Sequence, residues 1–344
     1  MITYIVLLFT LLLFWIISNC YPRSSTYLFY LGIILLVIIA SFKDISVGTD
    51  TLNYYDNFQF IQQYQNLRTY SGTQKIWYYI NLIFNSINNY TLFMIFCYSI
   101  SYGGIGYLIN KQSKDRILSL ILFFLFFFGA SLNIMRQYIA IGVFCIALYF
   151  LSNNNYYKYI IITIMASFFH FSTLLMIFLP IIQLINFSKT KFIILVISSF
   201  IVGFFLNIMN PIVMSLSFLM SLNEGAQGYL DSWGGERNLI TNLIINLVFI
   251  ISLYASKNKQ SLYIKMWLFF IVLSNLFGAS PQGNRIFIYL FIGMIIAIPN
   301  IFKELYYPIN KILYLSIILI YGIGYWYIVL SSGQNEIIPY QIRL

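Results

Sequence analysis

Four polar side chains in this mostly apolar chain could take part in chemistry: Arg136, Arg285, His170 and Asp50. Arginine presents a rigid fork of donors that suits bidentate binding of phosphate or carboxylate. Histidine is the side chain whose unperturbed pKa lies nearest neutrality, so His170 could accept a proton or donate a hydrogen bond to phosphate. Asp50 is an alternative proton acceptor. Together these residue types predict anion binding beside a general base.

Each of these residues also has a purely structural interpretation. An arginine near the centre of a bilayer costs about 2.5–3.5 kcal/mol on insertion scales, and it could snorkel to the interface or pair internally. His170 could be a half-buried histidine that bonds to a neighbouring carbonyl. Asp50 lies in the G-T-D-T turn of residues 48–51 and could cap a helix that starts near Leu52.

The composition indicates which elements must position these residues. The chain is 60% hydrophobic and 8% charged, with a mean hydropathy of +0.83, whereas a soluble domain carries about a quarter charged residues. We therefore expect an all-α, polytopic integral membrane protein that forms a single domain over residues 1–344, with about 11–12 transmembrane helices. The predicted spans lie near residues 2–19, 26–42, 91–109, 117–132, 134–151, 158–170, 172–186, 191–208, 239–256, 262–278, 285–302 and 311–330.

Two segments do not fit a simple span. Residues 75–90 predict an amphipathic helix at the membrane interface, because a span there would move the basic cluster of residues 111–116 to the other side. Residues 159–186 are too few to cross the membrane twice and more than is needed to cross it once. We expect two half-length helices that meet near His170.

The basic residues predict the orientation in the membrane. Of the 19 Lys and Arg residues, 12 fall on one side of this map and 7 on the other, and the positive-inside rule makes the richer side cytoplasmic. The cytoplasmic set is Arg23, Lys111, Lys114, Arg116, Lys158, Lys189, Lys191, Lys257, Lys259, Lys265, Lys303 and Lys311. The outer set is Lys43, Arg68, Lys75, Arg136, Arg237, Arg285 and Arg343.

Two long polar loops lie on the predicted outer side, near residues 43–90 and 209–238. Except for Asp115 and Glu304, every acidic residue of the chain is on this side as well. Loops of this length and polarity exceed what a connector needs, so we expect the chemistry at the outer face.

Several functional classes are disfavoured by what the sequence lacks. No G-x-x-x-x-G-K-[ST] motif occurs, so ATP hydrolysis is not expected. With one histidine, three scattered cysteines and no D-x-D pair, neither a metal nor another cofactor is expected. The basic residues form short clusters between apolar runs rather than a patch with aromatics, so nucleic acid is not an expected partner.

Five short elements of the sequence resemble those of a known family. They are V-G-T-D-T at residues 47–51 with Tyr54 after it, Arg136-Gln137 ahead of Ala140, His170-x-Ser172, Arg285 followed by Tyr289, and Pro339-Tyr340. In order and spacing they resemble the EpsG family of Wzy-type polysaccharide polymerases over nearly the whole chain. Where an arginine would be expected shortly before V-G-T-D-T, this chain has Lys43-Asp44.

The resemblance implies a GT-C-like membrane glycosyltransferase that polymerises repeat units of O-antigen, capsule or exopolysaccharide. Such an enzyme moves the growing glycan from one undecaprenyl diphosphate to another lipid-linked unit, at the outer face of the bacterial inner membrane. Its partners would be these lipid-linked oligosaccharides, membrane lipids, and the chain-length regulator and flippase of the same pathway. A flippase or other transporter of the same lipids, or an O-antigen ligase, is the alternative.

Under this hypothesis each candidate residue has a role. Arg136 and Arg285 bind the diphosphates of the two substrates, and His170 or Asp50 takes the proton of the acceptor hydroxyl. The candidates for contacts with the acceptor or glycan are Tyr54, Glu224, Asp231 and Tyr340.

Overall fold

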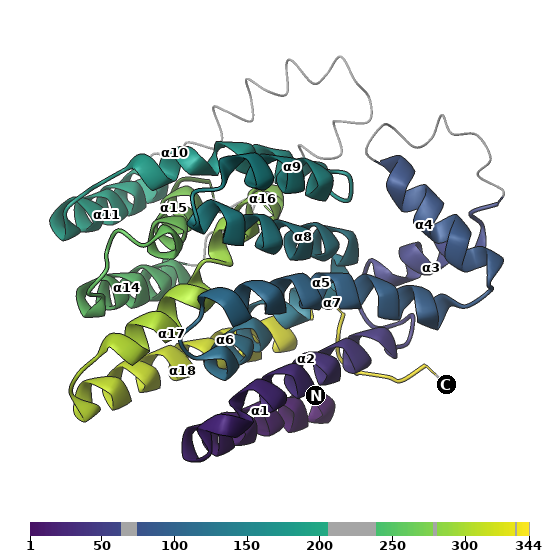
Figure 1. Ribbon diagram of the computed structural model, residues 1–344, viewed down its shortest axis with the longest axis horizontal. Coiled ribbons are helices and arrows are strands. Elements are labelled where there is room, and N and C mark those ends of the chain that lie inside the picture. The colour runs from purple at the N-terminus through teal and green to yellow at the C-terminus, as the bar shows by residue number, and fades with distance from the viewer. Residues whose placement is uncertain (63–73, 206–238, 278–280, 334–335, 344) are drawn as a thin grey trace. The chain divides into compact units, whose positions relative to one another are not determined.

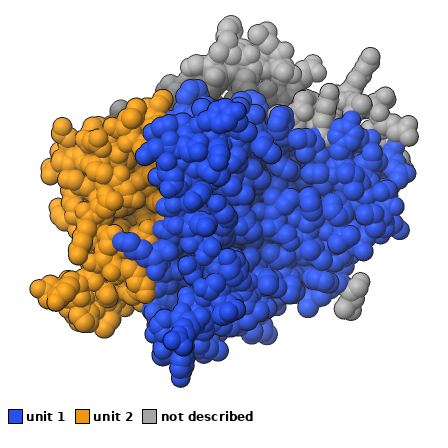
Figure 2. All heavy atoms as spheres, in the orientation of Figure 1, with its two compact units in different colours: residues 1–178, 319–344 blue, residues 179–318 orange. Residues whose placement is uncertain are grey.

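The computed structural model describes residues 1–62, 74–205, 239–277, 281–333 and 336–343. Within these residues every regular element is a helix, and the one strand-like pairing is an isolated bridge between Lys43 and Ile342. The chain forms two compact units, residues 1–178 with 319–344 and residues 179–318 (Figure 2). The single-domain expectation stays a prediction.

The helices of the first unit are labelled in Figure 1. They are α1 (Ile2–Cys20), η1 (Pro22–Ser24), α2 (Ser25–Ser41), α3 (Thr51–Gln59), α4 (Gln74–Ser86), α5 (Tyr90–Gln112), α6 (Arg116–Phe123), the π-helical η2 (Phe124–Phe128), α7 (Gly129–Asn133), α8 (Met135–Ser152), α9 (Tyr156–Ser167) and the 3-10 helix η3 (Phe171–Phe178). The last helix, α18 (Pro308–Ser331), begins in the second unit and ends in the first.

The second unit contains the remaining described helices. They are α10 (Leu179–Leu184), α11 (Lys189–Phe205), α14 (Leu239–Ala255), α15 (Leu262–Phe277), α16 (Pro281–Phe291) and α17 (Met294–Glu304). Helix α15 packs against α10, α11, α14, α16 and α17. Asn275 of α15 donates a hydrogen bond to Ser199 of α11 at 3.0 Å and exchanges hydrogen bonds with Asn246 of α14 at 2.9 Å, so amide groups join these apolar helices.

Seven helical segments in the described part of the chain are long and apolar enough to cross a membrane. They are Ile2–Cys20, Pro22–Ser41, Tyr90–Gln112, Arg116–Asn133, Met135–Ser152, Arg285–Glu304 and Pro308–Ser331. Each coincides with a predicted span, and further predicted spans correspond to shorter apolar helices. The 13-residue α4 lies where the sequence predicts an interfacial helix. An all-α, polytopic membrane fold is therefore confirmed, whereas its orientation in the membrane stays a prediction.

The outward face of α1 illustrates the environment that the fold requires. Ile2, Val6, Phe9, Leu13 and Ile16 recur every three or four residues and are all exposed. An exposed apolar stripe of this kind is unfavourable in water and favourable against lipid tails. The helix therefore presents this stripe to lipid.

The core of the first unit is built around residues 116–133. Helices α6, η2 and α7 follow one another without a break, and the side chains from Phe123 to Phe128 are all buried. Trp326 of α18 packs on Phe124, with ring centroids 5.9 Å apart. This buried run ends at Asn133 and so fixes the start of α8.

A close backbone crossing also fixes α8. A Cβ atom on Gly104 of α5 would lie 2.0 Å from the carbonyl oxygen of Gly142 of α8. Glycine lets the two backbones touch, as small residues do in membrane helix pairs. Arg136 lies six residues before Gly142, about 1.7 helical turns, so its position is set by this rigid packing.

The chain breaks near His170, as predicted. Helix α9 ends at Ser167, η3 begins at Phe171, and the two helices pack against each other. The hydroxyl of Tyr159 donates a hydrogen bond to the carbonyl of Met176 and ties them together.

In each unit, a residue of the predicted cytoplasmic set lies at one end of a helix and a residue of the predicted outer set follows the other end in the sequence. In the first unit, Arg116 donates to Thr26 at the start of α2 at 2.9 Å, whereas Lys43 follows the other end of α2. In the second unit, Lys265 lies near the start of α15 and Arg285 follows its far end. The 16 residues of α15 span about 24 Å. Which of these ends faces the cytoplasm stays a prediction.

Candidate functional site

The loop between α2 and α3 is built around a buried lysine. Lys43 is 2% exposed, and its ammonium donates hydrogen bonds to the carbonyl of Val47 at 2.7 Å, to the carbonyl of Leu132 and to the hydroxyl of Thr51. Burial lowers the pKa of Lys43 to about 7, and the charge of Asp50 partly offsets this effect. A buried ammonium needs such acceptors. Lys43 therefore fastens the V-G-T-D-T loop, residues 47–51, to the end of α7.

Gly48 allows the loop backbone to reach α7. Its φ is +98°, a conformation that L side chains rarely adopt. A Cβ atom at this position would lie 2.9 Å from the hydroxyl oxygen of Thr51 and 3.0 Å from the carbonyl oxygen of Leu132. The glycine is required both by the backbone conformation and by the space beside Lys43.

Asp50 is held by its backbone rather than by its side chain. The side-chain oxygen of Asn133 accepts hydrogen bonds from the Asp50 amide at 2.8 Å and from the Thr49 hydroxyl at 2.7 Å. Asp50 occupies the N-cap position of α3, which begins at Thr51, but its carboxylate makes no capping hydrogen bond. Asp50 therefore occupies the predicted N-cap position, but its side chain does not make the predicted capping hydrogen bond.

Residues 336–343, here called the strap, run alongside this loop. Three backbone hydrogen bonds join the two segments: from Gly48 to Glu336 at 3.0 Å, from Asp44 to Gln341 at 2.9 Å, and from Arg343 to Phe42 at 2.9 Å. These bonds satisfy backbone groups that a loop would otherwise leave to water. The strap thus closes one side of the candidate site.

Arg136 lies in the first turn of α8, against Trp77 of α4. The guanidinium carbon is 5.3 Å from the centroid of the Trp77 ring, and one guanidinium nitrogen donates to the carbonyl of Phe169 at 3.5 Å. Tyr54 of α3 packs edge-on against Trp77, with ring centroids 5.9 Å apart. Arg136 therefore links the predicted outer loop to the turn that carries His170.

His170 follows Phe169 directly and is half-buried. Its Nδ1 atom lies 2.6 Å from the hydroxyl oxygen of Ser172. This hydroxyl is a hydrogen-bond partner of the His170 ring. A hydrogen bond at Nδ1 fixes the ring orientation and so determines where Nε2 points.

The predicted site residues that the structure describes are divided between the two units. Asp50, Tyr54, Arg136 and His170 lie together in the first unit, whereas Arg285 has an exposed side chain in α16 of the second unit. The predicted glycan contacts Glu224 and Asp231 lie outside the described residues.

Tyr340 of the strap has structural partners. Its hydroxyl donates to the carbonyl of Ile39 at 2.7 Å, and its ring packs against that of Tyr4 with centroids 5.6 Å apart. Burial raises the pKa of Tyr340 to about 12, so the hydroxyl remains a donor at neutral pH. The contacts seen here anchor the strap to α2, and the glycan contact stays a prediction.

A second arginine fastens the strap to the aromatic side chains of α3 and α5. The guanidinium carbon of Arg343 lies 5.1 Å from the ring centroid of Tyr55 and 4.9 Å from that of Tyr90. Such cation–π contacts contribute about 0.5–2 kcal/mol each, depending on solvent exposure.

Three residues of this site were not predicted as part of it: Trp77, Asn133 and Glu336. Trp77 is one of many aromatics that a membrane interface explains equally well. Asn133 could have been predicted from the sequence, because it is an amide side chain at the end of an apolar span, three residues before Arg136. Glu336 is one of the acidic residues on the predicted outer side, and no motif marks it.

The arrangement provides a cation, a carboxylate and an imidazole on neighbouring elements. Within the described residues, no three His, Cys, Asp or Glu side chains gather closely enough to hold a metal ion. Arg136 can bind an anionic group, while Asp50 and His170 can each accept a proton. These are the parts that a transfer reaction with an anionic leaving group requires.

Comparison with known proteins gives one positive result. No curated protein and no solved structure matches the chain at a significant level. A family model described as the EpsG family matches residues 26–342, a range that contains the V-G-T-D-T loop, Arg136, His170 and Arg285. The chain therefore belongs to the EpsG family, a family akin to the Wzy-type polysaccharide polymerases.

Proposed function

We propose that this protein polymerises lipid-linked repeat units of O-antigen, capsule or exopolysaccharide. It transfers the growing glycan from undecaprenyl diphosphate to a new undecaprenyl-diphosphate-linked unit at the outer face of the inner membrane. The observation that carries this proposal, beside family membership, is that Asn133 and Arg136 place Asp50 and a guanidinium at the same helix junction.

The reaction joins two sugars and releases a lipid diphosphate. The acceptor hydroxyl oxygen attacks the anomeric carbon of the donor glycan, and the bond from that carbon to the diphosphate oxygen breaks. The hydroxyl proton passes to Asp50 or His170, and the undecaprenyl diphosphate leaves as an anion. Charge on the departing diphosphate is the main electrostatic demand of this step.

Arg136 meets that demand in the proposal. Its guanidinium rests on the apolar face of Trp77, where the local dielectric constant is lower than in water and a phosphate contact is correspondingly stronger. Arg285, the other candidate, binds the diphosphate of the second lipid-linked substrate.

Asp50 is the preferred proton acceptor. Its amide is bound to Asn133 while its carboxylate makes no capping bond, so the loop fixes the residue without using the carboxylate as a cap. His170 is the alternative, with its Nδ1 bonded to Ser172. Asp50→Asn and His170→Gln separate the two, because each variant keeps a polar side chain and removes a base. The variant that removes the base of the reaction should polymerise about 10²- to 10⁴-fold more slowly than the wild type.

The function is tested by comparing surface glycan from a deletion strain and a complemented strain on one gel. The proposal predicts a ladder of chain lengths in the complemented strain and single repeat units at the surface of the deletion strain. If the deletion strain lacks even single units at its surface, the protein is a flippase. If the deletion strain makes full-length polymer that stays on its lipid carrier, the protein is a ligase. An unchanged ladder in the deletion strain would contradict all three functions.

The leaving-group role is tested in the same strain with Arg136→Ala, Arg136→Lys and Arg285→Ala. Alanine should abolish the ladder, and lysine should restore it only partly because it lacks the bidentate fork. Arg23→Ala, an exposed arginine at the other end of α2, is the matched control and should leave the ladder unchanged. A normal ladder from both alanine variants, at normal membrane levels, would exclude the proposed role of the arginines.

A further inference from the structure

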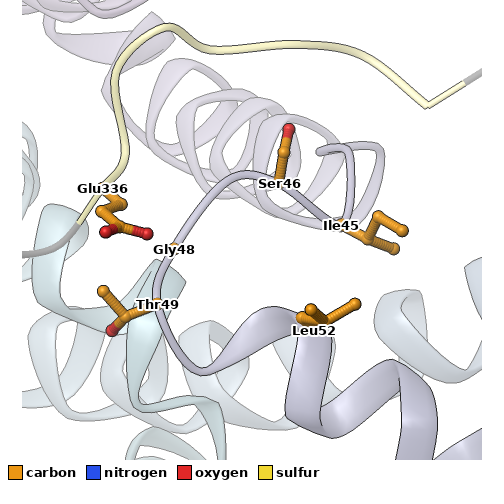
Figure 3. A pocket seen from close by; sticks show the side chains of 6 residues that line it. All are labelled: Ile45, Ser46, Gly48, Thr49, Leu52 and Glu336. Atoms are coloured by element: carbon orange, nitrogen blue, oxygen red, sulfur yellow. The ribbon is translucent and has the colours of Figure 1, made fainter.

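An open pocket lies beside the V-G-T-D-T loop, on the side covered by the strap. Its volume is about 370 Å³, and it is lined by Ile45, Ser46, Gly48, Thr49, Leu52 and Glu336 (Figure 3). This volume is within the range of small-molecule sites, about 300–1,000 Å³. The reaction outlined above assigns no role to this pocket.

Glu336 stands out in the wall by its backbone conformation. Its φ is +48°, and the other described non-glycine residues with positive φ are Asn88 and Asn154. Asparagine tolerates this region, whereas a glutamate there is uncommon. The backbone is held on both sides, since the Glu336 amide donates to Gly333 at 3.0 Å and its carbonyl accepts from Gly48 at 3.0 Å. Such strain is concentrated at functional positions in proteins.

The two hydroxyls of the pocket have already donated their protons. Ser46 donates to the carboxylate of Asp44 at 2.8 Å, and Thr49 donates to Asn133 at 2.7 Å. Each hydroxyl oxygen can still accept a hydrogen bond. Together with the Glu336 carboxylate, they give the pocket a polar wall made of acceptors.

The opposite wall is apolar. In Figure 3, Ile45 and Leu52 lie toward α3, whereas Thr49 and Glu336 lie on the other side of the loop backbone at Gly48. The six lining residues include a carboxylate and no cation. A phosphate would be repelled here, whereas a neutral group with several hydroxyl donors and an apolar face would be bound.

We propose that this pocket is a subsite for a neutral sugar residue of the glycan, with Glu336 accepting hydrogen bonds from its hydroxyls and with Ile45 and Leu52 against its C–H face. The identity of the ligand as glycan rests on the proposed function. Because Asp50 belongs to the same loop, a sugar held here is positioned relative to the proton acceptor.

The test measures binding without turnover. The probe is the oligosaccharide repeat unit released by mild acid from the host's own polysaccharide, titrated into purified full-length protein in nanodiscs. Loss of the charged acceptor in Glu336→Gln should weaken binding by about tenfold. Asp56→Asn, an exposed carboxylate on α3, is the matched control and should bind like the wild type. Inorganic pyrophosphate should not displace the probe.

A second variant keeps the test decisive if Glu336→Gln does not fold. Leu52→Trp narrows the pocket from the apolar wall, and Leu52 is 51% exposed, so the larger ring can be accommodated in the fold. It should weaken binding as much as Glu336→Gln does. Wild-type affinity in both variants would overturn the subsite.

Failure of the subsite and failure of the polymerase are distinguishable. A protein that rebuilds the ladder in the deletion strain but binds no repeat unit would overturn the subsite alone. A deletion strain with an unchanged ladder would overturn the proposed function whatever the binding result. A KM for the acceptor that rises in Glu336→Gln while kcat is kept would support the subsite.

Discussion

The backbone amide of Asp50 donates a hydrogen bond to the side-chain oxygen of Asn133 at 2.8 Å. Asn133 is the last residue of α7, and α8 begins two residues later, at Met135. The loop that carries Asp50 and the helix that carries Arg136 are therefore attached to one junction. Any change at this junction should affect the carboxylate and the guanidinium together.

Asn133→Ala removes the acceptor for both the Asp50 amide and the Thr49 hydroxyl. We expect shorter polymer at normal membrane levels, because two hydrogen bonds worth about 0.5–1.5 kcal/mol each are lost from the loop. Asn133→Asp keeps an oxygen acceptor and should recover most of the chain length. Equal loss in both variants would show that the hydrogen bonds to Asn133 are not what matters. The measurement is the modal chain length on a gel.

Lys43→Met should destabilise the protein by about 1–3 kcal/mol, because the carbonyl of Leu132 loses a buried donor. The measurement is the apparent melting temperature of the purified protein in detergent. Arg23→Met is the control, since Arg23 is exposed. A melting temperature equal to that of the control would contradict the structural role of Lys43.

The wild type and Lys43→Met should also differ in how their stability depends on pH. Burial lowers the pKa of Lys43 to about 7 from its usual 10.5. Between these pH values the unfolded chain binds more protons at Lys43 than the folded protein does, so raising the pH favours the folded state. Relative to Lys43→Met, the wild type should gain thermal stability from pH 7 to pH 10. A difference in melting temperature between the two proteins that stays constant from pH 7 to pH 10 would refute this linkage.

Gly48→Ala should disrupt the loop. The alanine meets both a left-handed backbone, which costs about 1–2 kcal/mol, and contacts of 2.9 and 3.0 Å to Thr51 and Leu132. We expect loss of the polymer ladder. Gly103→Ala is a matched control, since its Cβ atom would meet nothing within 4 Å, and it should support a normal ladder. A functional Gly48→Ala protein would mean that the loop can move away from α7 without harm.

Trp77→Ala removes the ring that supports Arg136. The cation–π contact contributes about 0.5–2 kcal/mol, so we expect a loss of activity that is smaller than that of Arg136→Ala. Tyr79→Ala, at an exposed position of the same helix, should have little effect. If Trp77→Ala retained wild-type activity, the guanidinium would not depend on this ring. Initial rates of chain extension in membrane vesicles measure the difference.

The sequence was sufficient to predict the helices. Long apolar runs predicted α1, α2, α5 and α8 because a bilayer requires such lengths. The break at His170 was also predictable, since residues 159–186 fit neither one crossing nor two. These features depend on local composition and length alone.

The assembly of the site could not be predicted in the same way. The burial of Lys43 depends on Leu132, 89 residues away, and the strap reaches the loop from Glu336 onwards. A period or a motif does not encode such contacts, because each depends on how distant segments pack. Trp77 was missed for another reason, since an aromatic belt accounts for any tryptophan near an interface.

The strap also has a consequence for the timing of biosynthesis. Residues 336–343 leave the ribosome long after the loop that they cover, and Tyr4 meets Ile337, 333 residues further along the chain. A nascent protein that stops at residue 331 has all seven long apolar helices found in the described residues, but it lacks the strap carbonyls that accept from the amides of Asp44 and Gly48. The backbone hydrogen bonds of Asp44 and Gly48 to the strap can therefore form only after these seven helices have been synthesised.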